Sequence, residues 1–224
     1  MVNNSEYFKR QIALWGEDVQ NNLSKKKIAI IGCGGLGSTL GITLGSSGIG
    51  EIHLVDFDTV SLHNLHRQIA YTIEDNEKYK CEQLSKLLKS RYDRLKTEIY
   101  AESFAEFATR DIELDLIIDA TDNFVTREQI DHYAKEKDIP WVYGTVEGFN
   151  GLVCFFDKAP FKVFEITDRK PGGITPPIVS FIASLEANYA LRYLAGLPIE
   201  KDELNYLYFD ANGALRHKKF NLIM

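Results

Sequence analysis

Four polar side chains that could bind a nucleotide follow one another in a short part of the chain. Asp56 ends an apolar run, and Asn64, Arg67 and Lys80 come after it. The Asp56 carboxylate could accept hydrogen bonds from ribose hydroxyls, or could instead cap a turn. The Arg67 guanidinium can form paired hydrogen bonds with phosphate oxygens. Asn64, on the same face of a helical turn, could donate a hydrogen bond to the same phosphate. Lys80 adds a positive charge on a flexible side chain. Each alone is often a surface residue, but together they suit a triphosphate better than a pyrophosphate bridge.

A glycine-rich turn precedes these residues, with the sequence Gly32-Cys33-Gly34-Gly35-Leu36-Gly37. It lies between an apolar stretch and a run of small residues, where a strand would lead into a helix. Glycines there let backbone N–H groups approach phosphate oxygens at the positive end of the helix. We expect Gly34, Gly35 and Gly37 to make these contacts. A tight turn that only packs the helix on the sheet is the alternative, and no Gly-Lys-Ser/Thr sequence follows that would indicate a P-loop.

A further carboxylate, Asp122, lies in the sequence Thr121-Asp122-Asn123, directly after the apolar run "LDLIIDA". A carboxylate at the end of a strand could hold Mg²⁺, which commonly takes one or two carboxylates together with substrate phosphates. Capping of the next helix by Asp122 or Asn123 explains the same residues equally well.

The apolar pattern predicts strands alternating with helices, and therefore a parallel sheet covered on both faces. After Gly144 the pattern changes to strands with no helix between them, a long apolar helix, and a hairpin around Asn212-Gly213. We therefore predict a Rossmann-like α/β fold, mostly parallel, extended by antiparallel strands in the C-terminal half. The expected strands are 27–32, 51–56, 97–101, 114–120, 141–146, 151–156, 161–164, 204–210 and 215–221. The expected helices are 36–47, 76–92, 123–136 and 178–194, and residues 171–177 are expected to form a loop.

The composition excludes several classes of protein. The chain has 224 residues, of which 45% are hydrophobic, and a net charge of −6. An acidic chain without a basic tract is a poor binder of nucleic acid. No apolar run is long enough to span a bilayer, and the first residues do not resemble a signal peptide. The three cysteines, Cys33, Cys81 and Cys154, are widely spaced and odd in number, which favours a reduced, cytoplasmic location.

Five segments together resemble the ThiF/MoeB/HesA family, the bacterial relatives of ubiquitin-activating enzymes. They are "FKRQIALWG", "IGCGGLGS", "VDFDTVSLHNLHRQ", "DATDN" and "TPPIVSFIASLEANYALRYLAG". The second and third segments at this spacing, followed by "TDN", are highly specific. The resemblance covers nearly the whole chain and implies one adenylation domain, residues 1–224. This domain would comprise an N-terminal helical segment (1–26), a nucleotide-binding half (27–146) and a carrier-binding half (147–224).

The resemblance implies that ATP activates the C-terminal carboxylate of a small ubiquitin-like sulfur carrier protein with a Gly-Gly tail, as in thiamine or molybdopterin biosynthesis. The products would be an acyl adenylate and pyrophosphate. Asp56 would hold the ribose, and Asn64, Arg67 and Lys80 the phosphates. Asp122 would bind Mg²⁺. The resemblance also implies a homodimer, in which Arg10 of one subunit reaches the ATP of its neighbour.

Three features depart from the family pattern. Many members bind zinc through two Cys-x-x-Cys pairs in the C-terminal half, but Cys154 is the only cysteine after Cys81, so zinc is not expected. No cysteine occurs between 157 and 175, where some relatives carry a reactive one, so a partner would have to supply sulfur. Glu77 stands where a glycine is common, which leaves Lys78 as an alternative to Lys80.

Two other functions remain open at this stage. An NAD-dependent oxidoreductase would share the glycine turn and Asp56, but would leave Arg10, Arg67 and Asp122 without a role. An inactive scaffold subunit of a heterodimeric activating enzyme would share the fold, but such subunits tend to lose the phosphate-binding residues that this chain retains.

Overall fold

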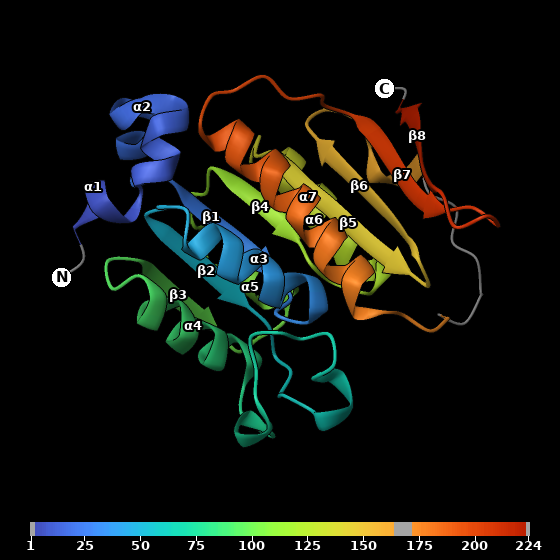
Figure 1. Ribbon diagram of the computed structural model, residues 1–224, viewed down its shortest axis with the longest axis horizontal. Helices are drawn as coiled ribbons and strands as arrows, with labels where there is room; N and C mark the ends of the chain where they lie inside the picture. The colour runs from blue at the N-terminus through green and yellow to red at the C-terminus, as the bar shows by residue number, and fades with distance from the viewer. Residues whose placement is uncertain (1–2, 164–171, 223–224) are drawn as a thin grey trace.

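The computed structural model describes residues 3–163 and 172–222 and is built around a single eight-stranded sheet. The strand order is β3-β2-β1-β4-β5-β6-β7-β8 (Figure 1). β1 to β5 are parallel, whereas β6, β7 and β8 each run antiparallel to the strand before. This confirms the predicted Rossmann-like sheet with its antiparallel extension. The strands are β1 (Lys27–Ile31), β2 (Glu51–Val55), β3 (Lys96–Tyr100), β4 (Leu116–Asp119), β5 (Trp141–Glu147), β6 (Asn150–Phe156), β7 (Glu203–Phe209) and β8 (Leu215–Asn221).

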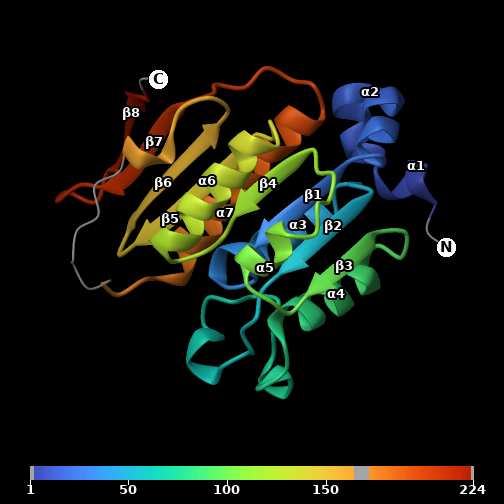
Figure 2. The same ribbon diagram turned by 180° about the vertical axis from the view of Figure 1, so that it is seen from behind.

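Helices cover both faces of the sheet. α3, α4 and α7 lie on the face turned to the viewer in Figure 1, and α5 and α6 lie on the reverse face in Figure 2. α1 and α2 pack at the end of the sheet where the parallel strands begin. The helices are α1 (Asn4–Tyr7), α2 (Lys9–Leu23), α3 (Gly35–Gly45), α4 (Lys80–Arg91), α5 (Phe104–Ala108), α6 (Phe124–Glu136) and α7 (Pro176–Leu194), with short 3₁₀ turns η1 (Leu62–Asn64), η2 (Ile73–Asp75) and η3 (Phe161–Val163).

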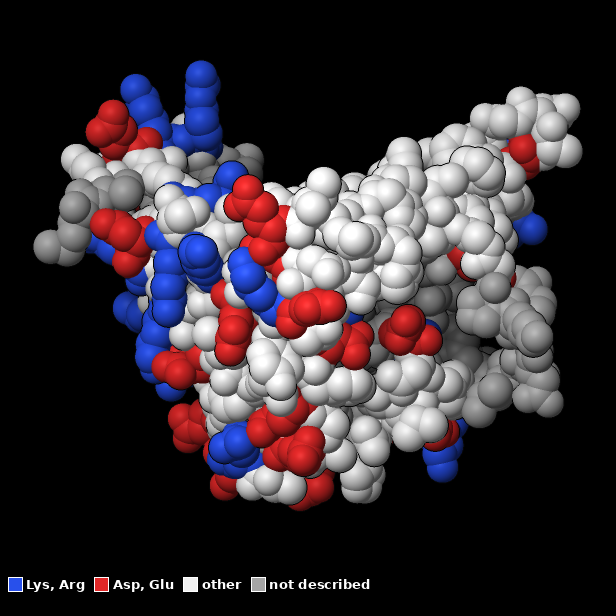
Figure 3. All heavy atoms as spheres, turned by 90° about the horizontal axis from the view of Figure 1, so that it is seen from below, with Lys and Arg blue, Asp and Glu red and all other residues white. Residues whose placement is uncertain are grey.

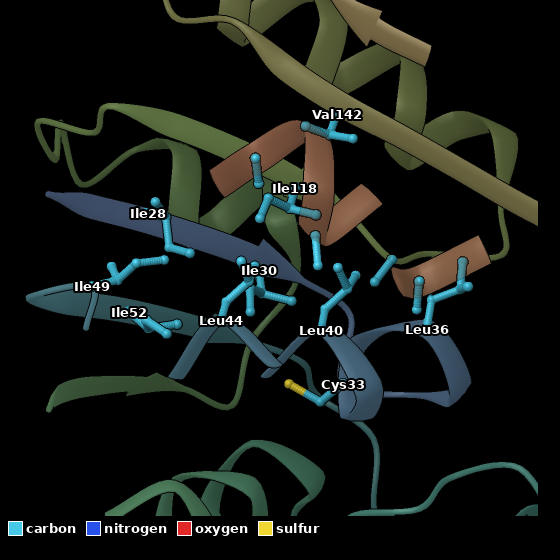
Figure 4. Close-up of a cluster of buried hydrophobic side chains, with 14 of the residues drawn as sticks. Ile28, Ile30, Cys33, Leu36, Leu40, Leu44, Ile49, Ile52, Ile118 and Val142 are labelled. Carbon is cyan, nitrogen blue, oxygen red and sulfur yellow. The ribbon is translucent and has the colours of Figure 1, made fainter. Parts of the chain in front are cut away.

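The central strands β1 and β4 are almost entirely apolar because both of their faces are buried. Along β1, Ile28 and Ile30 join the core beneath α3 and α7, whereas Ala29 and Ile31 join the core beneath α5 and α6. Successive side chains of a strand point to opposite faces, so residues 28–31 of β1 contribute alternately to the two cores. Figure 4 shows the first core, where Leu40 and Leu44 of α3 lie near Ile30 of β1.

Two predicted elements differ in the structure. The helix expected from residue 76 begins only at Lys80, because the residues before it pair with the chain after β2, as in the bridge between Thr59 and Tyr79. The strand expected at 161–164 is wrong. Residues 161–163 form η3, and residue 164 lies outside the described residues.

The position of Phe161 explains the second difference. Its ring packs against Trp141 and Tyr143, with centroids 5.6 and 5.4 Å apart, and its N–H donates to the Asp131 carboxylate at 3.2 Å. The backbone is thereby anchored to α6, and β7 takes the place beside β6.

The hairpin predicted around Asn212-Gly213 is confirmed as the connection between β7 and β8. Gly213 has a φ of 76°, in the left-handed region that favours glycine. Of the loop expected at 171–177, residue 171 lies outside the described residues, and Pro176 already begins α7, where proline is well tolerated. No helix in the described part of the chain is long and apolar enough to cross a membrane.

Candidate functional site

A cavity of about 800 Å³ lies at the carboxyl ends of β1, β2 and β4. Ile31, Val55 and Ala120, at or just after the ends of these strands, form part of its wall. The volume is within the usual range for small-molecule sites, and the position is the usual one in open α/β sheets. The predicted site residues that line the cavity are Gly34, Gly35, Asp56, Asn64, Arg67, Lys80 and Asp122.

The glycine turn serves two purposes. Gly34 is the N-cap of α3 and forms no side-chain capping bond, so the positive end of the helix faces the cavity. Gly37, by contrast, is not among the described residues that line the cavity. A Cβ on Gly37 would lie 1.9 Å from the Gly32 carbonyl oxygen, and one on Gly32 would lie 2.7 Å from that of Ala120. Gly32 and Gly37 are therefore required for close packing, and Gly34 and Gly35 remain as candidate phosphate contacts.

Asp56 joins the glycine turn to the segment after β2. Its carboxylate accepts hydrogen bonds from the backbone N–H groups of Cys33 at 2.6 Å and Asp58 at 2.7 Å. Burial raises the pKa of Asp56, and the nearby Lys80 ammonium partly offsets this effect. The turn-capping role therefore exists in the structure. It does not exclude ribose binding, because each carboxylate oxygen can accept more than one hydrogen bond.

The chain between Asp58 and Lys80 leaves the sheet and returns to it. Backbone bonds from Glu77 N to Val60 O and from Lys80 N to Asp58 O close its base. Within this excursion, η1 ends at Asn64, and the Arg67 N–H donates to the Asn64 carbonyl at 3.1 Å. One turn of chain thus brings both side chains to the cavity wall.

The two candidate lysines lie in different places. Lys80 lines the cavity and is only 5% exposed. Lys78 is not part of the described lining and lies 3.6 Å from Asp75. Glu77 has a φ of 67°, which explains why a glycine suits this position. The backbone nevertheless adopts this conformation with glutamate, and Lys80 is the lysine that faces the site.

Asp122 and Asn123 have separate roles at the end of β4. Asn123 is the N-cap of α6, where its side chain accepts from the Thr126 N–H at 2.8 Å. Helix capping therefore does not require Asp122. Its carboxylate lines the cavity and has no hydrogen-bond partner among the residues that the structure describes, so it is free to bind a cation that accompanies phosphate groups.

Arg127 is a residue of the site that the sequence analysis missed. It is 8% exposed, lines the cavity, and donates through Nε to the buried Asp119 at 3.0 Å and through Nη2 to the Thr121 carbonyl at 2.5 Å. It therefore fixes the turn that carries Asp122. A signal was present in the sequence, because Asp119 interrupts an apolar strand and a buried carboxylate requires a partner.

Gln68 also lines the cavity and was not assigned a role beforehand. The side chain is 3% exposed, and its amide nitrogen would lie 3.5 Å from a Cβ placed on Gly34. It is therefore close to the glycine turn.

Arg10 is the predicted residue that lies farthest from this arrangement. It is an exposed residue of α2, at the end of the sheet opposite the cavity (Figure 1). On the face shown in Figure 3, basic side chains gather along one side with acidic ones beside them, and much of the rest of the face is uncharged.

The cysteines are buried in the apolar interior. Burial raises the pKa of Cys81 to about 11 and that of Cys154 still further, so both thiols remain protonated at neutral pH. Within residues 3–163 and 172–222, no three His, Cys, Asp or Glu side chains lie close enough together to hold a metal ion.

The sequence model of the ThiF family matches residues 8–221. The chain is 32% identical over 193 residues to the adenylyltransferase and sulfurtransferase MOCS3 of Dictyostelium discoideum, covering 80% of this chain and 45% of that protein. It is 27% identical to the sulfur carrier protein ThiS adenylyltransferase of Escherichia coli K12 (84% and 79% covered) and 29% identical to the molybdopterin-synthase adenylyltransferase of Haemophilus influenzae (83% and 82%).

Among solved structures, E. coli MccB with ATP superimposes with a TM-score of 0.85 and 21% identity, covering 98% of this chain and 72% of that one. At this identity the likeness concerns the fold. The chain spans about half the length of MOCS3, the first of the relatives named above.

Proposed function

Because the chain belongs to the ThiF family, we propose that it uses ATP to adenylate the C-terminal glycine of a small ubiquitin-like sulfur carrier protein. A carboxylate oxygen of the carrier attacks the α-phosphorus, the bond from that phosphorus to the β-phosphate oxygen breaks, and pyrophosphate leaves. The product is an acyl adenylate of the kind used in thiamine or molybdopterin biosynthesis. The named adenylyltransferases of E. coli and H. influenzae support this assignment, one for each pathway.

One observation carries the proposal. A single cavity is lined by the N-terminus of α3, which has no side-chain cap, and by three charged residues, Arg67, Lys80 and Asp122. Such a set suits a triphosphate, since its donors can neutralise the charge that develops on pyrophosphate as it leaves. The reaction needs positioning and charge rather than a protein nucleophile. This agrees with the three buried thiols, none of which lines the described cavity.

Each residue then has a distinct task. Asp56 holds the ribose while it fixes the glycine turn. Asn64, Arg67 and Lys80 bind phosphate oxygens, and Gly34 and Gly35 allow the chain to approach them. Asp122 would hold Mg²⁺, which would supply positive charge to the phosphates. We further propose that residues 27–146 bind the nucleotide and residues 147–224 the carrier.

The protein acts as a homodimer in this proposal, and Arg10 completes the site of the neighbouring subunit. A separate donor brings the sulfur. The NAD-dependent alternative uses Asp56 and the glycine turn but gives no role to Arg67, Lys80 and Asp122, although all three face the cavity.

The test is exchange of labelled pyrophosphate into ATP by the purified chain with a carrier that ends in Gly-Gly. Exchange should need the intact tail and disappear with a carrier that lacks it. Arg67→Ala should lower the rate by about 10²-fold or more, as expected for loss of a charged donor in a transition state. Arg91→Ala is the matched control, because Arg91 is an exposed arginine at the other end of the sheet, hydrogen-bonded to Ser46. Equal rates for wild type and Arg67→Ala, or tight binding of NAD in place of ATP, would refute the proposal.

A further inference from the structure

The Lys80 ammonium has one hydrogen-bond partner among the described residues, the carboxylate of Asp58 at 2.7 Å. The two side chains differ strongly in exposure: that of Lys80 is 6% exposed and that of Asp58 is 54% exposed. Both line the cavity. A buried ammonium without a partner is costly, so the carboxylate stabilises Lys80 at the wall of the site.

Backbone hydrogen bonds hold Lys80 and Asp58 close to each other. The Lys80 N–H donates to the Asp58 carbonyl at 3.0 Å, which ties the first residue of α4 to the segment after β2. The Asp58 N–H donates in turn to the Asp56 carboxylate at 2.7 Å. The candidate ribose residue and the candidate phosphate residue are thus joined through Asp58.

A triphosphate in the cavity would meet a lysine whose charge is already paired. The carboxylate would also repel the incoming phosphates. Because Lys80 is enclosed and Asp58 is half exposed, Asp58 is the partner that can release the pair by turning to solvent. The lysine would then face the phosphate without having moved.

We propose that Asp58 is a positioning residue for Lys80, which it holds in place until a phosphate group takes over the ammonium. The inference rests on the proposed function. It implies that Asp58 weakens the binding of ATP but speeds the chemical step, because Lys80 is already in position when the phosphate takes over its ammonium. A residue needed only for folding, or a ligand of the metal, would not have these opposite effects.

The experiment uses Asp58→Asn, which preserves shape and removes the charge. The dissociation constant of a non-hydrolysable ATP analogue should fall by up to about tenfold, because a negative charge leaves the phosphate site. The rate constant of carrier-dependent pyrophosphate exchange should fall by about tenfold or more. In a Lys80→Met background, Asp58→Asn should cause no further loss of rate, because no ammonium remains to be positioned.

Asp138→Asn is the matched control. Asp138 forms an exposed ion pair with Lys158 at 2.9 Å before β5, at the other end of the sheet, and its left-handed backbone accommodates asparagine. This variant should bind and exchange like wild type. It removes the same charge from the protein without touching the cavity.

The outcomes separate the two proposals. A wild-type protein that neither binds ATP nor exchanges pyrophosphate refutes the proposed function. If wild type is active, weaker analogue binding together with slower exchange in Asp58→Asn overturns only the positioning role. A higher Mg²⁺ requirement would overturn it too, because Asp58 would then be a metal ligand. Should Asp58→Asn fail to fold, Asp58→Ser replaces it, and failure of both would assign Asp58 to the fold.

Discussion

The burial of Glu186 in α7 can be tested by measuring how the stability of the protein depends on pH. It is fully buried, and neither carboxylate oxygen has a hydrogen-bond partner among the described residues. A Cβ on Gly144 would lie 2.2 Å from the Glu186 carboxyl carbon, so the acid occupies space that this glycine leaves open in β5. Burial raises the pKa of Glu186 well above its usual value of 4.5, Asp119 raises it further, and Arg127 opposes both.

The sign of the pH effect follows from this shift. The native state keeps a proton that the unfolded chain releases above pH 4.5, so the resulting stability is complete below that pH. It is lost as pH rises through the native pKa. Between pH 4.5 and the native pKa, the free energy of unfolding falls by about 1.4 kcal/mol per pH unit.

Glu186→Gln keeps the shape of the side chain and cannot ionise. The variant should therefore gain stability relative to wild type as pH rises, with a slope of about 1.4 kcal/mol per unit. Urea unfolding of both proteins at pH 5, 6, 7 and 8 measures this difference. Asp119 is present in both proteins and cancels to first order, and the exposed Glu128→Gln on α6 is the control. A difference that does not change with pH would refute the reasoning, because it would mean that Glu186 ionises as in the unfolded chain.

Three further predictions concern other parts of the molecule. Glu77→Gly should raise the free energy of unfolding by about 0.5–1 kcal/mol in denaturant titrations, because it relieves the left-handed backbone of Glu77. Cys154→Ser should lower stability by about 1–3 kcal/mol but leave the exchange rate per folded molecule unchanged; loss of sulfur transfer with adenylation intact would contradict this. Arg10→Ala and Asp122→Ala homodimers should both be nearly inactive in exchange, whereas mixed dimers should recover up to half of the activity per dimer. No recovery after demonstrated subunit exchange would show that Arg10 does not act across subunits.

The central strands of the sheet could be predicted because a strand buried on both faces leaves a pattern in a few consecutive residues. A strand buried on both faces must be apolar at every position, as "KIAII" and "LIID" nearly are, and the residues after such strands gather at one edge. The sequence therefore predicts that Asp56 and Asp122 lie at the same edge of the sheet, where the cavity is found. The strand predicted at 161–164 is wrong because the conformation of residues 161–163 depends on Asp131 and on aromatic residues of distant strands.

The charged pairs of the site could not be predicted in the same way. Lys80 and Asp58 are 22 positions apart, and their contact depends on the backbone bonds that close the excursion after β2. Glu186 is polar in a helix of mostly apolar residues, and a pattern cannot show that it lies beneath Gly144 rather than in solvent. Partners of buried charges are chosen by tertiary geometry, which spacing alone does not encode.

The position of Arg10 combines the family resemblance of the sequence with the geometry of the structure. α2 is fastened to the end of the sheet opposite the cavity, where the side-chain amides of Gln11 and Gln20 both donate to the Ser47 carbonyl, at 2.9 and 3.0 Å. Trp15 reinforces this attachment with a hydrogen bond to Gln20 at 3.1 Å. A helix held in this way cannot carry Arg10 to the cavity of its own chain. Any contact between Arg10 and a bound nucleotide must therefore come from a second chain, which is why the mixed-dimer experiment can decide the matter.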